Sequence, residues 1–403
     1  MRNKIKDVYS TLPPELKLVL LCIRQQVTEK VQEDIYMLTA GPMDWDLFIH
    51  LTVRHRVYPL AYRYLSMCNH SVVPHKVINI LRQKSRENMS KSLQMTGELV
   101  KVLRGMEDKG IHAVVLKGLP LAYKLYGNVA VRPSRDLDIL VWPADVEKAR
   151  KVLEEQGYNR KHPSFIETPA RLRIWMKAQH HFAYWHQEKE IYVELHWRLG
   201  HQGVEIPLTA VKNSLTQVKI AGQLICVPKT EELLLFLVMH GAGHAWFRLR
   251  WICDIAMILR QEGFCWERLY GLAGRLGVTT LLNHAVILAR NLLEATVPDN
   301  IAAAAEKDCK AQKWALMAIP FIFVVNFDFA HLRISMPMYY HYKRYEYSIK
   351  DGWRSKLAYL CSRFSPEERD IEQIVLPAYL YFIYYLIRPF TWFSRRVAQS
   401  LGR

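Results

Sequence analysis

The chain has 403 residues, of which 50% are hydrophobic and 11% aromatic, and its formal net charge is +17. This composition excludes a disordered chain and supplies enough apolar material for a sizeable core in two or three domains. The seven cysteines are dispersed and include no C-x-x-C pair, which argues against a disulfide scaffold and a thiolate metal site. The basic excess predicts a polyanionic partner: nucleic acid, an acidic lipid surface or a phosphorylated substrate.

The charge and the first residues also bear on location and partners. The opening MRNKIKDVYSTLPPEL lacks the apolar run and the cleavage site of a secretory signal, so we expect a cytoplasmic protein. No run of lysine and arginine forms a nucleic-acid-binding tail. The alternative to a nucleic-acid partner is that the positive charge serves solubility and attracts nucleotide.

The first 110 residues have the apolar periodicity of helices. The spacing predicts helices over Leu16–Val27, Trp45–Tyr64 and Val77–Met106. Pro59 is expected to interrupt the second of them, because proline lacks the backbone N–H that a helix interior needs.

The stretch from 113 to 141 reads AVVLKGLPLAYKLYGNVAVRPSRDLDILV. Its pattern predicts a buried strand over Ala113–Leu116 and a tight turn at Lys117 and Gly118. A short helix over Leu119–Tyr126 follows, opened by a proline at its second position.

A second strand, Asp136–Val141, follows a loop that carries Arg132 and Arg135. Side chains two apart on a strand share a face, so Asp136 and Asp138 project together. Two neighbouring carboxylates need positive charge between them. Mg²⁺ suits that position, because it is commonly held by one or two carboxylates together with substrate phosphates. The alternative is that both acids form the solvated face of an edge strand.

A predicted helix over Asp145–Gln156 is followed by a hairpin made of His180–Gln187 and Ile191–Trp197. Strand, helix, strand and helix in succession are typical of a small α/β unit. On the second hairpin strand Glu194 shares a face with His196. A charge inside an otherwise apolar strand needs a partner or a metal, so Glu194 is predicted to be a third acid of the site. The alternative is a rim glutamate paired with an arginine.

Two histidine pairs are weaker signals. His50, His55 and Arg56 suggest a metal or phosphate site, but histidines five apart share a helix face poorly, which favours ordinary surface or core roles. His240 and His244 have the four-residue spacing of a metal-binding pair. No acid lies between them and glycines weaken the helix there, so zinc is not the favoured interpretation.

From residue 230 the chain is predicted to be helical again. A membrane-spanning helix needs about 20 apolar residues. Trp314–Val325 is shorter than that, and Ile374–Phe393 contains Pro377 and Pro389. These segments are expected to be core helices, or an aromatic and basic surface that contacts a membrane peripherally.

The block K-G-x-P-L-A-x-x-L-Y-G…R-x-x-R-D-L-D-I-L-V, with V-E-L-H-W later on, resembles the polymerase β-like nucleotidyltransferase superfamily. More narrowly, it resembles a bacterial family of uncharacterised nucleotidyltransferases. The segment H-x-x-x-H…W…L-x-W-x-x-D-I-A extends the resemblance to about Trp45–Leu259. One departure is the turn, which is Lys117-Gly118 where Gly-Ser or Gly-Gly is usual, with a gap of 136 − 118 = 18 before the acids.

The resemblance implies an α+β fold, with a small mixed sheet and helices flanked by N-terminal and C-terminal helical regions. We expect an N-terminal helical region over 1–110, a nucleotidyltransferase catalytic domain over 111–228 and a C-terminal helical domain over 229–403.

The resemblance also implies roles for individual residues. The catalytic residues, which would bind Mg²⁺ or Mn²⁺ in a two-metal site, are Asp136, Asp138 and Glu194. The residues expected at the nucleotide phosphates are Lys117, Gly118, Arg132 and Arg135, with a fold-stabilising ion pair as the alternative for the three basic side chains. The residues expected beside the substrate are His196, His244, Arg248 and Asp254, with an internal polar network between helices as the alternative for the last three. For His180, His181 and His196 the alternative is a structural, hydrogen-bonded histidine.

The function predicted from these residues is Mg²⁺-dependent transfer of a nucleoside monophosphate from an NTP, expected to be ATP. The acceptor would be a hydroxyl of a peptide, another biosynthetic intermediate, a natural product, a protein or an RNA. One alternative is a kinase that moves phosphate at the same site. The other is a catalytically silent protein that binds NTP or RNA, and the presence of all three acids favours an enzyme.

Overall fold

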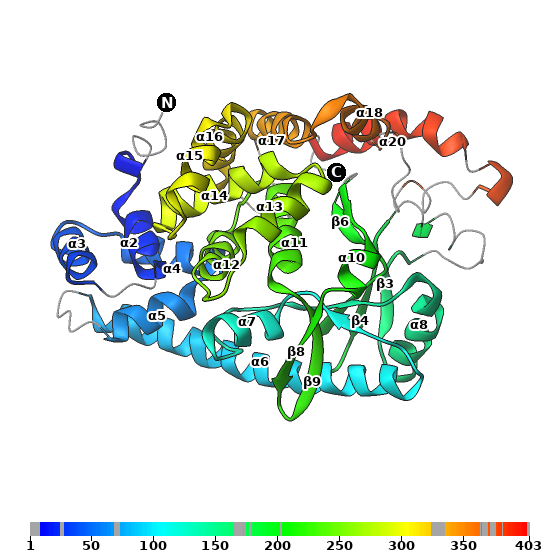
Figure 1. The fold of residues 1–403 in the computed structure, drawn as a ribbon, viewed down its shortest axis with the longest axis horizontal. Coiled ribbons are helices and arrows are strands. Elements are labelled where there is room, and N and C mark those ends of the chain that lie inside the picture. The colour runs from blue at the N-terminus through cyan, green and yellow to red at the C-terminus, as the bar shows by residue number, and fades with distance from the viewer. Residues whose placement is uncertain are drawn as a thin grey trace.

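The computed structural model describes residues 9–24, 28–67, 73–164, 172, 175–176, 179–201, 204–323, 335–362, 364, 370, 376–380 and 382–400. A five-stranded mixed sheet lies between the long helix α6 on one side and a large group of helices on the other (Figure 1). This arrangement confirms the expected α+β class with helical flanks.

The N-terminal part is helical, as predicted. Its helices are α2 (Pro14–Ile23), α3 (Glu29–Thr39), α4 (Trp45–Arg54), α5 (Tyr58–Met67) and α6 (His75–Asp108). The predicted interruption at Pro59 is wrong in position, because the chain breaks at Arg56, whose φ is 56°. Pro59 instead lies in the first turn of α5, where the missing N–H has no partner to lose.

The main sheet has the order β1 (Val114–Val115), β2 (Asp136–Leu140), β5 (Ile191–His196), β4 (His181–His186) and β3 (Asn159–His162). Strands β2 and β5 are parallel, and the other neighbours are antiparallel. The predicted strands and the β4–β5 hairpin are therefore confirmed. Helix α7 (Leu119–Tyr126) links β1 to β2, and the 3₁₀ turn η1 (Pro143–Asp145) with α8 (Val146–Glu155) follows β2.

The pleat of β2 separates its apolar and acidic side chains. Leu137 and Ile139 are buried in a cluster with residues of α6 and α8 such as Met106 and Val152. Asp136 and Asp138 point to the opposite face, because successive side chains of a strand alternate. Burial of the apolar face thus fixes which way both acids project.

The elements after the main sheet are mostly helical. They are β6 (Leu199–His201), β7 (Val204–Ile206), α10 (Leu208–Lys212), β8 (Leu215–Ile220), β9 (Gln223–Pro228), α11 (Thr230–Gly243), α12 (Leu249–Leu259), α13 (Trp266–Arg275), α14 (Thr279–Leu293), α15 (Asp299–Lys307), α16 (Cys309–Phe323), α17 (Met336–Ser348), α18 (Gly352–Ser362), η2 (Ala378–Leu380) and α20 (Ile383–Ser400). Helices from both ends of the chain share one apolar cluster, which includes Phe48 of α4 and Leu288 of α14. The three-domain division at 110 and 228 stays a prediction.

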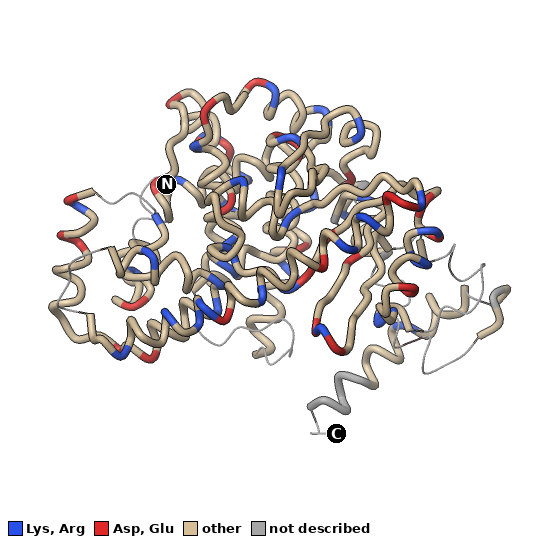
Figure 2. The backbone as a smooth tube through the Cα atoms, turned by 90° about the horizontal axis from the view of Figure 1, so that it is seen from below, with Lys and Arg blue, Asp and Glu red and all other residues tan. Residues whose placement is uncertain are grey.

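The two apolar C-terminal segments differ in burial. Trp314 and Phe321 of α16 are buried, so this segment is a core helix. Helix α20 instead exposes Leu386, Phe390 and Phe393. Residues 324–325, 374–375 and 381 of the two predicted segments lie outside the described residues. Among the described residues, no helix is both long enough and apolar enough to cross a membrane. Basic and acidic residues are interspersed along the chain (Figure 2), and peripheral membrane contact and nucleic-acid binding stay predictions.

Candidate active site

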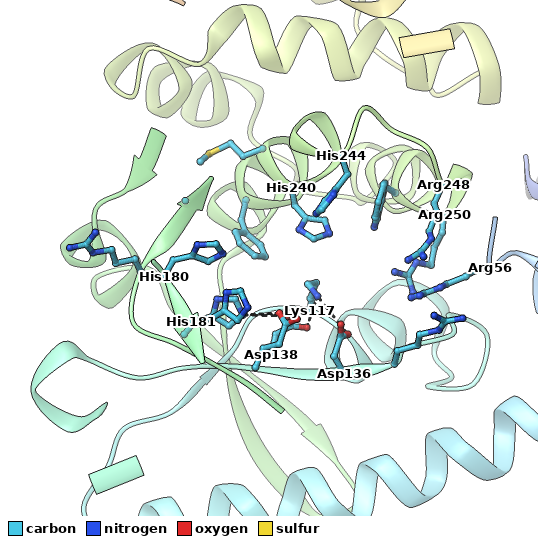
Figure 3. A pocket seen from close by; sticks show the side chains of 18 of the residues that line it. Arg56, Lys117, Asp136, Asp138, His180, His181, His240, His244, Arg248 and Arg250 are labelled. Atoms are coloured by element: carbon cyan, nitrogen blue, oxygen red, sulfur yellow. Dashed lines mark ion pairs between the residues drawn. The ribbon is translucent and has the colours of Figure 1, made fainter. Parts of the chain in front are cut away.

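A cavity of 490 Å³ opens over the acidic face of β2. Its floor is formed by β2 and β5 with the turn after β1, and its opposite wall by α11 and α12 (Figure 3). Asp136, Asp138 and Glu194 all line it. The cavity therefore brings together Asp136 and Glu194, which lie 194 − 136 = 58 residues apart in the sequence.

The three acids are placed by strand register. Asp138 of β2 is the register partner of Glu194 on the parallel strand β5, so both carboxylates project from the same face. Asp138 is fully buried, whereas the side chains of Asp136 and Glu194 are each 29% exposed to solvent. One carboxylate thus lies at the bottom of the cavity and two lie nearer to its opening.

Two basic side chains neutralise this acidic group in the structure. The Lys117 Nζ atom lies 2.7 Å from Asp138 Oδ2 and 3.7 Å from Asp136 Oδ1. Burial lowers the pKa of Lys117, but the charges of Asp136 and Asp138 outweigh it and raise the pKa. His196 Nε2 lies 3.4 Å from Asp138 Oδ1 and 3.3 Å from Glu194 Oε2.

The same contacts set the charge states of His196 and Glu194. Burial lowers the pKa of His196, but the carboxylates of Asp138 and Glu194 raise it to about 9. Burial raises the pKa of Glu194, but contact with His196 and the charge of Lys117 lower it to about 2. Glu194 is therefore a carboxylate across the physiological pH range, and His196 faces it as an imidazolium.

The donor set of the acids fits a hard divalent cation. Atoms of Asp138, Glu194 and His196 lie within 4.8 Å of one another, and Asp136 projects from the same strand face as Asp138. Carboxylate oxygens are the ligands that Mg²⁺ and Mn²⁺ prefer. The buried Asp138 carboxylate, neutralised only by Lys117 and His196 among the described residues, shows that positive charge belongs at this position.

Arginines gather at the other end of the cavity, beside Asp136 (Figure 3). Burial, together with repulsion from Arg248 and Arg135, lowers the pKa of Arg56 to about 9. Burial and the charges of Arg132 and Arg56 lower the pKa of Arg250 well below its usual range. The buried Arg250 Nε atom has no hydrogen-bond partner within the described part of the chain. Crowded, desolvated guanidinium groups of this kind fit an anionic ligand.

Arg132 and Asp254 do not line this cavity. The Arg132 Nε atom donates to Asp254 Oδ1 at 2.8 Å, and its Nη2 atom donates to Asp254 Oδ2 at 2.8 Å. Both side chains are almost completely buried. The structure places these two residues outside the cavity, where their ion pair holds the loop before β2 against α12. The expected roles of Arg132 at the nucleotide and of Asp254 at the substrate stay predictions.

Gly118 also lies outside the lining of the cavity. It precedes α7 with φ 76°, a backbone conformation that favours glycine. A Cβ atom there would lie 3.3 Å from the Ser134 Oγ atom, and that hydroxyl donates to the Asp136 carbonyl. The structure therefore gives Gly118 a positioning role, since it lets the turn approach the start of β2.

The remaining predicted residues, Lys117, Arg135, His196, His244 and Arg248, all line the cavity. His180 and His181 join them from the β4 side. Burial, followed by the charge of Arg248, lowers the pKa of His244 to about 4, so this ring is neutral. His244 stacks on Trp251 at 5.4 Å between ring centroids. The wall opposite the acids therefore combines neutral rings with the cation of Arg248.

Sequence reasoning missed Arg250 as a cavity residue, and it set Arg56 aside in favour of an ordinary surface or core role. His55 explains why Arg56 reaches the site, because its Nδ1 atom accepts the Leu249 backbone N–H at 3.2 Å and ties the α4–α5 break to α12. Arg250 stands two residues after the predicted Arg248, and this spacing was the available signal. Nothing in the local sequence around Arg56 indicated the contact, because it joins segments 194 residues apart.

Comparison with known proteins agrees with this geometry. The family model described as uncharacterised nucleotidyltransferase matches residues 41–294. No curated protein matches the chain. The solution structure of the antibiotic-resistance factor ANT(2'')-Ia matches at 13% identity and a TM-score of 0.29, over 53% of this chain and 96% of that one; a TM-score this low supports no inference. Because the family match spans more than half of the 403 residues of this chain, the chain belongs to the family of uncharacterised nucleotidyltransferases and is a nucleotidyltransferase.

Proposed function

We propose that the cavity transfers a nucleoside monophosphate from an NTP, with ATP the first candidate, to a hydroxyl of an acceptor such as a peptide or another biosynthetic intermediate. The observation that carries the proposal is the register pairing of Asp138 with Glu194, with Asp136 on the same face and arginines beside it. Carboxylates next to a cationic pocket suit the joint binding of a metal ion and a triphosphate.

Each part of the cavity has a role in this reaction. Asp136, Asp138 and Glu194 would hold Mg²⁺ or Mn²⁺, which supplies positive charge at the phosphates and acidifies the acceptor hydroxyl. Arg56, Arg248 and the other arginines bind the triphosphate and stabilise the charge on the leaving pyrophosphate. The acceptor oxygen forms a bond to the α-phosphorus, the bond to the bridging oxygen breaks, and pyrophosphate leaves with the electron pair.

The charge state of Glu194 favours a role as a metal ligand over a role as the general base. A general base works best with a pKa near the operating pH. Contact with His196 and the charge of Lys117 overcome burial and hold the pKa of Glu194 at about 2. Glu194 therefore acts as an ionised oxygen ligand, and the proton of the acceptor hydroxyl is released to solvent water.

The test is nucleotide transfer with labels at two positions. The protein is incubated with α-³²P or γ-³²P NTP, with Mg²⁺ or Mn²⁺, and with a fractionated cell extract as the source of acceptor. Asp136→Asn is the inactivating variant, because Asp136 is partly exposed and contributes little to the core. Asp108→Asn is the matched control, since Asp108 lies exposed at the end of α6, outside the cavity.

We expect label from the α position to appear in an extract component with the wild type and Asp108→Asn, and not with Asp136→Asn. Transfer from the γ position alone would replace the proposal with a kinase. NTP binding without transfer of either label, across all extract fractions, would contradict catalysis and favour a binding protein.

A further inference from the structure

Three imidazoles lie together at the β4–β5 edge of the cavity, beside the acids. His181 and His196 are register partners on β4 and β5. His180 directly precedes β4, and its carbonyl accepts the Trp197 N–H at 3.1 Å, which continues the same ladder. Backbone pairing therefore holds all three residues in place.

The rings converge on one another. Their centroids lie 4.6 Å apart for His180 and His181, 5.1 Å for His181 and His196, and 5.8 Å for His180 and His196. One nitrogen from each ring lies within 4.8 Å of the others. Figure 3 shows His180 and His181 on the side of the cavity opposite Arg56, Arg248 and Arg250. The cluster is thus separated from the cationic end where the phosphates are proposed to bind.

Three buried nitrogen atoms in the cluster have no hydrogen-bond partner among the described residues. They are His181 Nδ1 and both ring nitrogens of His196, of which Nε2 faces the carboxylates of Asp138 and Glu194. A buried polar atom without a partner is unfavourable and calls for an explanation. An ion bound between the three rings would satisfy the two Nδ1 atoms.

The contacts of His196 fit such an ion. Its Nε2 atom faces the carboxylates of Asp138 and Glu194 at 3.4 and 3.3 Å. This leaves Nδ1, which releases its proton to solvent when a metal ion binds, as the ligand atom. Metal-binding histidines usually donate their other ring N–H to a carboxylate, which fixes the ring and its tautomer. The acids would thus serve as hydrogen-bond acceptors for His196 while they remain available to a hard cation.

We propose that His180, His181 and His196 bind one transition-metal ion of the Zn²⁺ type, at a site separate from the oxygen ligands of the acids. Imidazole nitrogens select Zn²⁺, Co²⁺ or Ni²⁺ over Mg²⁺. Tetrahedral ligands with bonds of about 2.0–2.1 Å lie about 3.4 Å apart. Because the three nitrogens lie within 4.8 Å of one another, they close by at most about 1.4 Å on binding. Three protein ligands leave a fourth position open to the cavity.

The experiment uses Co²⁺ as the probe on full-length, tag-free protein that has been stripped of metal, with no nucleotide present. Co²⁺ held by imidazoles in a four-coordinate site gives visible ligand-field absorption, and titration gives the stoichiometry. The variants are His180→Ala and His181→Ala, and His112→Ala is the matched control because His112 is exposed outside the cavity. Circular dichroism and thermal unfolding without metal verify that each variant is folded.

We expect one Co²⁺ per chain in the wild type and in His112→Ala, with affinity at least about 100-fold weaker in the two cluster variants. Zn²⁺ should displace Co²⁺, and a large excess of Mg²⁺ should not. Two results would place the ion at the acids and overturn the proposal. One is displacement of Co²⁺ by Mg²⁺. The other is a Co²⁺ spectrum that is lost in Asp136→Asn but retained in folded His181→Ala. The Co²⁺ titration does not depend on nucleotide transfer. Absence of Co²⁺ binding therefore leaves the proposed reaction standing, and absence of nucleotide transfer leaves the proposed metal site standing.

Discussion

Arg132, in the loop before β2, binds both carboxylate oxygens of Asp254 on α12, with each side chain almost completely buried. The motif segment R-x-x-R-D-L-D therefore contains two arginines with different tasks. Arg132 is committed to the fold, and Arg135 is exposed at the cavity.

Arg132→Met should lower the free energy of unfolding by about 3–5 kcal/mol, because it leaves the Asp254 carboxylate buried without its partner. Arg135→Met, the matched change three residues on, should leave stability nearly unchanged and weaken NTP binding. Urea unfolding and nucleotide titration measure the two effects. A natively stable Arg132→Met protein that loses only nucleotide affinity would restore the role predicted from the sequence.

Asp136→Asn and Asp138→Asn should both reduce transfer by about 100-fold or more, since each removes a charge that faces the reacting phosphates. Their stabilities should differ. Asp138 is fully buried between Lys117 and His196, so its loss should lower the free energy of unfolding by about 3 kcal/mol. Asp136 is partly exposed, and its loss should change stability by less than about 1 kcal/mol. Equal thermal shifts for the two variants would refute this difference in burial.

Arg56→Gln should stabilise the ligand-free protein and weaken the binding of triphosphate by about 10-fold or more. Burial and the neighbouring Arg248 and Arg135 disfavour the charge on Arg56, as its pKa of about 9 indicates. A triphosphate relieves this repulsion, so ATP should raise the melting temperature of the wild type more than that of the variant. A lower melting temperature in ligand-free Arg56→Gln would show instead that Arg56 stabilises the fold.

The His284→Phe variant should lose less stability than the wild type when the pH is lowered into the mildly acidic range. Burial lowers the pKa of His284 from 6.5 to about 3, among Trp246, Trp314 and Tyr345. Below pH 6.5 the unfolded chain therefore binds a proton that the folded chain excludes, and stability falls as the pH decreases towards 3.

At pH 5 this single residue should account for about 2 kcal/mol, from 1.5 pH units at 1.36 kcal/mol each. Urea unfolding at pH 7.5 and 5.0 measures the difference between wild type and variant. The same acid dependence in both proteins would show that His284 is not buried as a neutral ring.

Local sequence was sufficient for the elements that carry the acids. Helix α7 has the predicted bounds, and β2 and β5 deviate from theirs by one residue at the C-terminal end. The alternation of Asp136 and Asp138 with buried leucine and isoleucine follows from the two-residue period of a strand. The interruption at Pro59 was misplaced because proline is well tolerated in the first turn of a helix. The break instead lies at Arg56, directly after His55, which a tertiary hydrogen bond ties to α12.

The sequence by itself determined the three acids, the face that the two aspartates share and the strand–turn–helix–strand order, because these depend on periods of two and 3.6 residues. Only the tertiary structure decided which basic residues meet the acids. It directed Arg132 to Asp254, brought Arg56 and Arg250 to the cavity and gathered His180, His181 and His196 at its edge. Such contacts join distant segments through the packing of α12 and the register of β4 with β5, and local patterns do not encode them.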